Sequence, residues 1–131
     1  MIIVDTTVWI DYLLGTTNSE TLWLDHQLER QRLGLTDLIL CEVLQGMADD
    51  SRFMQTQDDL LKFHVFHTGG TDIAIAAAMN YRVLRQRGYT VRKTIDCLIA
   101  TFCLEVEHEL LHRDHGFDPF ERVLGLRVVH P

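Results

Sequence analysis

The amino-acid sequence predicts an α/β fold in three layers, with helices on both faces of a central and mostly parallel sheet. Short apolar runs rich in β-branched residues alternate with longer segments whose apolar residues recur at helical spacing. Acidic residues follow two of these short runs, Asp5 after the first and Asp114 after a later one. Because ligands of such sheets bind beyond the carboxyl ends of the strands, the pattern also predicts a site there.

Residues 1–4 are apolar and too few for a helix, which is typical of a buried parallel strand. Two helices follow, over residues 6–14 and 18–32. Their ends are predicted by capping residues and glycines, namely Thr6 or Thr7 with Gly15, and Asn18 or Ser19 with Gly34. A third helix begins near Thr36, and its expected apolar stripe contains Leu40, Cys41, Leu44, Met47 and Ala48.

In the second half, Ser51 can cap a helix that runs to Leu61, and residues 63–67 alternate weakly like a short strand. Residues 71–88 form the clearest helix, because its apolar residues lie on one side and Gly88 ends it.

Thr94 can cap the next helix, whose first turn contains Asp96. Residues 109–112 are expected to form a short strand. A final helical turn opens at Asp118 or Pro119, and residues 126–129 resemble a β-branched strand.

The chain has 131 residues, of which 47% are hydrophobic, and only two prolines, so we expect a single domain over residues 1–131. No apolar run approaches the length that spans a bilayer, and no positively charged leader precedes Asp5. A cytoplasmic protein with no membrane partner is therefore expected. Cys41, Cys97 and Cys103 lie in apolar surroundings without paired spacing, which predicts reduced thiols in the core.

Four acidic residues carry the functional prediction. Asp5, Asp96 and Asp114 lie where apolar segments end or change character, and Glu42 interrupts a further apolar run. Each one alone is explained by a helix cap, the helix dipole, a turn or a solvated surface. Together they indicate a site for Mg²⁺ or Mn²⁺, because several carboxylates near a core almost require a divalent cation. Hydrolysis of a nucleic-acid backbone by metal-activated water is the natural reaction.

The net charge of −7 argues against nucleic-acid binding by the chain as a whole. Five of the twelve basic residues, however, fall in one stretch ahead of Asp96. Its candidate contacts with an RNA backbone are Arg82, Arg85, Arg92 and Lys93. An ordinary solvated helix face and loop is the equally plain interpretation of this stretch.

Other chemistries have weaker support. His108, His112 and His115 could suggest zinc, but no cysteine pair has finger spacing. A GxSxG elbow and a glycine-rich phosphate loop are both absent, and the cysteines lie within apolar runs.

Four short motifs occur in order along almost the whole chain: DTTVWI at 5–10, EVLQG at 42–46, DCLIA at 96–100 and LLHRDHGFD at 110–118. With these motifs the sequence resembles the PIN-domain ribonucleases, and among them the VapC-type toxins of bacterial toxin–antitoxin pairs. The resemblance implies a three-layer α/β/α fold and an endoribonuclease that depends on Mg²⁺ or Mn²⁺. It also implies a cognate antitoxin that blocks the site, and a homodimer.

The resemblance further implies roles for individual residues. Asp5, Glu42, Asp96 and Asp114 match the acidic quartet of the family, as catalytic residues and metal ligands, and Thr6 matches a hydroxyl that supports the site by hydrogen bonding. The chain departs from the pattern at Gly116, where many relatives have a second acid. That departure leaves open a second metal position and the role of Asp118.

Two other functions stay open from the residues alone. A phosphoacceptor receiver domain would need a second acid beside Asp5 and a lysine after the last strand, and both are missing. A PIN-like module that has lost catalysis and only binds RNA or protein is the other. The aromatic residues that could line an antitoxin groove or a dimer contact, but at helical spacing also suit a core, are Trp9, Tyr12, Trp23 and Phe53.

Overall fold

A computed structural model of the chain describes residues 1–131 and contains one four-stranded parallel sheet. The strands are β1 (Ile2–Val4), β2 (Leu33–Thr36), β3 (His64–Phe66) and β4 (Glu109–Leu111), in the order β3-β2-β1-β4. In the centre of the sheet, Ile3 of β1 is paired with Gly34 on one side and Leu110 on the other. All strands run in the same direction, so their carboxyl ends share one edge.

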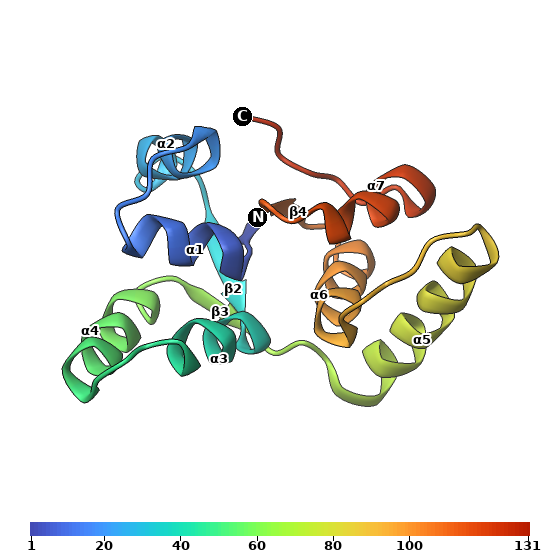
Figure 1. Cartoon of the computed structure of the whole chain (residues 1–131), viewed down its shortest axis with the longest axis horizontal. Coiled ribbons are helices and arrows are strands. Elements are labelled where there is room, and N and C mark those ends of the chain that lie inside the picture. Colours follow the sequence, from blue (N-terminus) through green and yellow to red (C-terminus); the bar gives the residue numbers. More distant parts are fainter.

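Helices cover both faces of this sheet (Figure 1). One layer holds α1 (Thr6–Leu13), α2 (Ser19–Gln27), α3 (Asp37–Gln45) and α4 (Asp50–Leu60). The other holds α5 (Gly70–Gln86), α6 (Thr94–Glu105) and α7 (Asp118–Leu124), with the short 3₁₀ helix η1 (His115–Phe117) before α7. The three-layer α/β/α prediction is confirmed. No helix is long and apolar enough to cross a membrane.

The predicted helix starts at Asn18, Thr36 and Asp118 are confirmed, whereas the caps of α1, α4 and α6 lie one or two residues earlier than predicted. Asp5 caps α1 by accepting the backbone N–H of Thr7, so Thr6 and Thr7 are inside the helix. Asp49 caps α4 in place of Ser51, and Lys93, without a side-chain cap, precedes α6 in place of Thr94. A carboxylate that ends a loop in an extended conformation satisfies the first free N–H groups of the helix.

The prediction of a helix closed by Gly34 was wrong. The second helix ends at Gln27, and Gly34 lies inside the buried strand β2 between β1 and β3. A Cβ atom at Gly34 would lie 2.9 Å from the backbone oxygen of His64 and 3.0 Å from the sulfur of Met1. Glycine therefore allows the close approach of β2 to its neighbours, rather than ending a helix.

The core contains 24 buried hydrophobic residues around the sheet. Helix α3 buries Ile39 and Val43, which is a different face from the predicted stripe. In consequence Cys41 is exposed and was wrongly assigned to the core, whereas Cys97 and Cys103 are buried as predicted. The strand predicted over residues 126–129 is reduced to a single bridge between Leu110 and Val128.

Candidate active site

A polar pocket of about 400 Å³ opens at the carboxyl ends of β1 and β4. All four predicted acids line it, although they come from positions 18 to 109 residues apart in the chain (5, 42, 96 and 114). The complete lining is Asp5, Thr6, Thr7, Ile10, Asp11, Glu42, Lys93, Asp96, Arg113 and Asp114.

Asp5 follows β1 directly and is only 2% exposed. Its Oδ2 accepts hydrogen bonds from the backbone N–H of Thr7 at 3.2 Å and from the Thr7 hydroxyl at 2.7 Å. Burial raises the pKa of Asp5 to about 6, and the two Thr7 hydrogen bonds act in the opposite direction. Removal of water from the carboxylate therefore outweighs the hydrogen bonds that stabilise its charge.

Asp96 lies in the first turn of α6 and is 8% exposed. Its pKa is raised to about 7, first by burial and then by the charges of Asp5 and Asp114, whereas Lys93 lowers it. No protein group donates a hydrogen bond to its side chain, in contrast to Asp5. Asp96 thus has the strongest electrostatic need for a cation in the pocket.

Glu42 and Asp114 are held by hydrogen bonds that leave one carboxylate oxygen free. The hydroxyl of Thr6 donates to Glu42 Oε1 at 2.8 Å across the gap between α1 and α3. The backbone N–H of Gly116 donates to Asp114 Oδ1 at 2.8 Å. A Cβ atom at Gly116 would lie 3.6 Å from Asp96 Oδ2, so the residue without a side chain borders the acids directly.

The donors of this pocket suit a hard divalent cation. Asp5 Oδ1, Glu42 Oε2, Asp114 Oδ2 and both oxygens of Asp96 have no hydrogen-bond partner in the protein. None of these oxygens belongs to the buried unsatisfied atoms, so they remain reachable from the pocket. No three acidic, histidine or cysteine groups are already positioned to hold a metal ion. Mg²⁺ needs only one or two direct carboxylates and keeps several waters, so free oxygens around a pocket satisfy its requirement.

Sequence reasoning missed three polar residues of this pocket, Thr7, Asp11 and Arg113, and one apolar residue, Ile10. Thr7 holds Asp5 and also accepts the backbone N–H of Arg113 at 3.1 Å. Thr7 and Asp11 are four residues apart in the otherwise apolar helix α1, so this polar i, i+4 pair was the available signal.

Of the predicted RNA-binding residues, only Lys93 lines the acidic pocket. Arg82 and Arg85 line a separate, largely apolar groove between α5 and α6, and Arg92 is exposed in the loop before α6. Asp118 lies outside the acidic pocket as well, where it contacts His115 at 2.8 Å.

Asp118 and His115 belong to a neighbouring polar pocket of about 410 Å³ without hydrophobic lining. It shares only Arg113 and Asp114 with the acidic pocket. Its lining residues are Glu20, His112, Arg113, Asp114, His115, Asp118, Glu121, Arg122 and His130.

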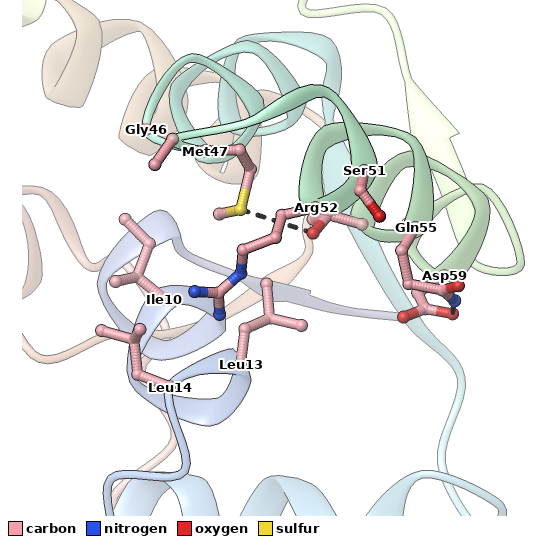
Figure 2. Close-up of a pocket in the computed structure, with 11 residues that line it drawn as sticks. Ile10, Leu13, Leu14, Gly46, Met47, Ser51, Arg52, Gln55 and Asp59 are labelled. Atoms are coloured by element: carbon pink, nitrogen blue, oxygen red, sulfur yellow. Dashed lines mark hydrogen bonds between the residues drawn. The ribbon is translucent and has the colours of Figure 1, made fainter.

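A third hollow of about 470 Å³ lies between α1 and the segment that joins α3 to α4 (Figure 2). Ile10, Leu13 and Met47 give it an apolar lining, and Arg52 extends from α4 across it toward α1. Ile10 also lines the acidic pocket, so the two hollows are adjacent.

The four aromatic residues singled out from the sequence do not line any of these three hollows. Trp9 belongs to the core, and Tyr12 and Trp23 pack against it. Phe53 is 38% exposed on α4.

Comparison with known proteins agrees with this architecture. Residues 2–123 match the family model described as the PIN domain. The chain is 29% identical to Ribonuclease VapC11 of Mycobacterium tuberculosis over 142 aligned positions, which cover 98% of each chain. It has the same identity and coverage with VapC ribonuclease Mb1587 of Mycobacterium bovis.

Solved structures show the same fold at lower identity. VapBC2 from Rickettsia felis, crystallised with a DNA fragment from its promoter, contains a chain that superposes with a TM-score of 0.78 at 16% identity, covering 98% of both chains. A toxin–antitoxin complex from Klebsiella pneumoniae gives a TM-score of 0.73 at 20% identity, covering 100% of this chain and 98% of the other.

Proposed function

Because this chain belongs to the PIN-domain family, we propose that it is a metal-dependent endoribonuclease and the toxin of a toxin–antitoxin pair. The observation that carries the proposal is the convergence of Asp5, Glu42, Asp96 and Asp114 on one pocket, with free oxygens and with two of the four pKa values raised. The relatives named as VapC ribonucleases align over nearly the whole chain, which supports a single-domain ribonuclease over residues 1–131, and we place it in the cytoplasm.

We assign the cation, Mg²⁺ or Mn²⁺, to the pocket formed by Asp5, Asp96 and Asp114, where one or two of these carboxylates bind it directly and the rest through its waters, with Glu42 binding either the cation or its water. When bound, the cation would offset the phosphodiester charge, lower the pKa of water and stabilise the leaving oxygen. Thr6 orients Glu42 by donating its hydroxyl proton to Oε1.

Thr7 fixes Oδ2 of Asp5, which leaves Oδ1 for the site. Lys93 brings a positive charge near Asp96, which favours the ionised carboxylate.

The decisive experiment measures RNA cleavage by wild type, Asp5→Asn and Asp96→Asn with and without Mg²⁺ or Mn²⁺. Asp58→Asn is the matched control, since Asp58 is an exposed aspartate of α4 outside the pocket. Loss of cleavage in the two site variants alone would support the site, and equal activity in all four proteins would refute it. Sequencing of RNA ends after brief induction in cells identifies the cleaved bond.

A catalytically inactive binding module is the remaining alternative. Under that alternative, calorimetry would detect no binding of Mg²⁺ or Mn²⁺ to the wild-type protein, and no RNA ends would appear after induction. Nothing in the pocket favours it, because all four acids of the quartet are present.

The antitoxin, in this proposal, binds the groove that Figure 2 shows. An occupant of the groove between Leu13 and Met47 reaches the acids by passing Ile10, which borders both hollows. Arg52 has no acidic partner in the protein, so the occupant should combine apolar side chains with a carboxylate that pairs with Arg52. We expect Leu13→Glu to lose the antitoxin in co-purification and to retain RNA cleavage.

For the homodimer, we place the second copy on the outer face of α5. Ile75, Met79 and Val83 recur there at four-residue spacing and are 57%, 61% and 37% exposed. A continuous apolar strip of this kind favours a helix-mediated contact. Met79→Lys should convert the dimer to a monomer in light scattering, whereas the same change at exposed Met54 should not.

A further inference from the structure

Arg113 lies where the acidic pocket meets the neighbouring polar pocket. Arg113 follows β4 and lines both the acidic pocket and the neighbouring polar pocket. Asp114 is the only other residue that lines both pockets. The side chain is 42% exposed, so it is accessible from solvent while it forms part of both walls.

The position of Arg113 is fixed from two sides. Its backbone N–H donates to the hydroxyl of Thr7, and that hydroxyl in turn donates to Asp5. Its Nη1 donates to Asp11 Oδ2 at 3.0 Å, and its Nε lies 3.3 Å from Glu20 Oε1. The guanidinium is therefore tied to both α1 and α2 before any ligand arrives.

These contacts leave part of the guanidinium free. Nη2 has no hydrogen-bond partner in the protein, and Nη1 carries a second N–H beyond the one used by Asp11. A partly exposed ion pair contributes only about 0–1 kcal/mol to stability, so stability alone is a weak reason for this clamp. An arginine held in place loses less side-chain entropy when it binds a phosphate bidentately.

The distribution of charge in the acidic pocket favours a contact between Arg113 and a phosphate. Five carboxylates line the pocket and repel a polyanion, whereas its only cationic lining residues are Lys93 and Arg113. Lys93 precedes α6 in one helical layer, and Arg113 is tied to α1 and α2 in the other (Figure 1). An RNA strand that contacts both cations therefore spans the two helical layers at the pocket that the acids line.

Resting on the proposed ribonuclease function, we propose that Arg113 binds the RNA phosphate next to the scissile one. The strand then continues along the neighbouring polar pocket, where His115 and Arg122 lie among the carboxylates of Glu20, Asp118 and Glu121. Asp11 and Glu20 are positioning residues that hold the arginine, and the neighbouring phosphate is a non-reacting group that contributes to substrate binding.

The test uses a single-stranded RNA oligonucleotide that carries the cleavage site mapped in cells, with a fluorophore and a quencher. Cleavage is measured for wild type, Arg113→Ala, Arg113→Lys and Asp11→Asn over a range of salt concentrations. Arg30→Ala is the matched control, because Arg30 is exposed and lies in the loop before β2, at the opposite edge of the sheet.

We expect Arg113→Ala to raise KM about tenfold, as for one charged hydrogen-bonded contact, with kcat within about twofold. The dependence of log KM on log salt concentration should become shallower by about 0.7, the value for one phosphate contact with a single strand. Arg113→Lys should lie between wild type and Arg113→Ala, and Arg30→Ala should match wild type.

Asp11→Asn separates a phosphate contact from a structural clamp. It removes the charge of one of the two acidic partners that Arg113→Ala also loses, but it keeps the cation and the Glu20 contact, so its KM should stay within about threefold of wild type under the proposal. Equal losses in the two variants, or an unchanged KM in Arg113→Ala, would overturn the inference while wild type still cleaves RNA. If wild type does not cleave RNA with either metal, the proposed function fails and this inference fails with it.

Discussion

Asp5→Asn should stabilise the metal-free protein at neutral pH, although it removes a proposed metal ligand. Asp5 is 2% exposed, and burial raises its pKa from 3.8 to about 6. A shift of that size corresponds to a free energy of about 3 kcal/mol that opposes folding once the carboxylate is ionised. Asparagine is neutral, so it avoids this term.

Asparagine also preserves the local structure. Both hydrogen bonds that Asp5 accepts end on the same oxygen, Oδ2, and come from Thr7. The single carbonyl oxygen of asparagine can accept both, and asparagine caps a helix as well as aspartate does. The comparison therefore isolates the charge.

The sign of the pH dependence follows from linkage. The folded pKa lies above the unfolded one, so between about pH 4 and pH 6 the folded state binds more protons than the unfolded state. Below pH 4 the side chain of Asp5 is neutral in both states and has almost no effect on the unfolding free energy, which then falls as the pH rises through that window and the buried carboxylate ionises. The difference between Asp5→Asn and wild type should grow from near zero at pH 4 to about 3 kcal/mol at pH 7.5.

Urea unfolding followed by tryptophan fluorescence in EDTA, at half-unit steps from pH 4 to pH 8, measures this difference. Asp58→Asn is the control for the change of side chain at an exposed position. A variant that is less stable than wild type at pH 7.5, or a difference that does not change with pH, would refute the reasoning. Added Mg²⁺ should stabilise wild type and leave the variant almost unchanged.

Three further predictions address other parts of the molecule. Gly34→Ala should lower the unfolding free energy by about 1–3 kcal/mol in urea titrations, because its Cβ would meet a backbone oxygen at 2.9 Å. Gly88→Ala is unsuitable as a control because Gly88 has a positive φ, so exposed Ala48→Ser is the control. Thr6→Val should lower kcat for RNA cleavage about tenfold with little effect on stability, because Glu42 loses its donor, and Thr6→Ser should restore activity. The ring nitrogens of His108 are buried without partners and its pKa is lowered by burial, so wild type should lose stability as the pH falls below about 6.5. His108→Phe should reduce that loss in thermal unfolding scans between pH 5 and pH 7, and an unchanged pH dependence would contradict the assignment.

The parts of the fold that the sequence predicted are those with strong local signals. Residues 1–4 and 71–88 have unambiguous apolar patterns, and both elements are present as β1 and α5. Strand β2 was missed because LGLT is four residues long and contains a glycine, which resembles the end of a helix. Only its pairing with β1 and β3, far away in the sequence, makes it a strand.

The buried face of α3 could not be predicted for a related reason. Most of its residues are apolar, so more than one stripe fits the helical period. The packing of α3 against α1 and β2 selects Ile39 and Val43, and the same packing turns Glu42 toward Thr6.

The candidate site also has a part that the sequence predicted and a part that it did not. The four acids could be proposed from motifs, because each lies in a recognisable local pattern. The network around them depends on contacts between distant positions: Arg113 donates to Thr7 over 106 residues and to Asp11 over 102. Nothing near Arg113 in the sequence indicates those partners.

Helix capping and the helix dipole explain Asp5 and Asp96 individually, and this explanation can be compared with the proposed metal site. Asp5 does cap α1, but asparagine would cap it equally well without a charge that disfavours folding by about 3 kcal/mol. Asp96 does lie in the first turn of α6, where the helix dipole favours the ionised carboxylate, but burial and the charges of Asp5 and Asp114 outweigh this effect and raise its pKa to about 7. Capping and dipole effects therefore explain why an acid is tolerated at these positions, not why the charge is there. A cation in the pocket would favour the ionised form of both carboxylates, so the cost of holding these charges in the metal-free pocket is a physical argument for the proposed metal site.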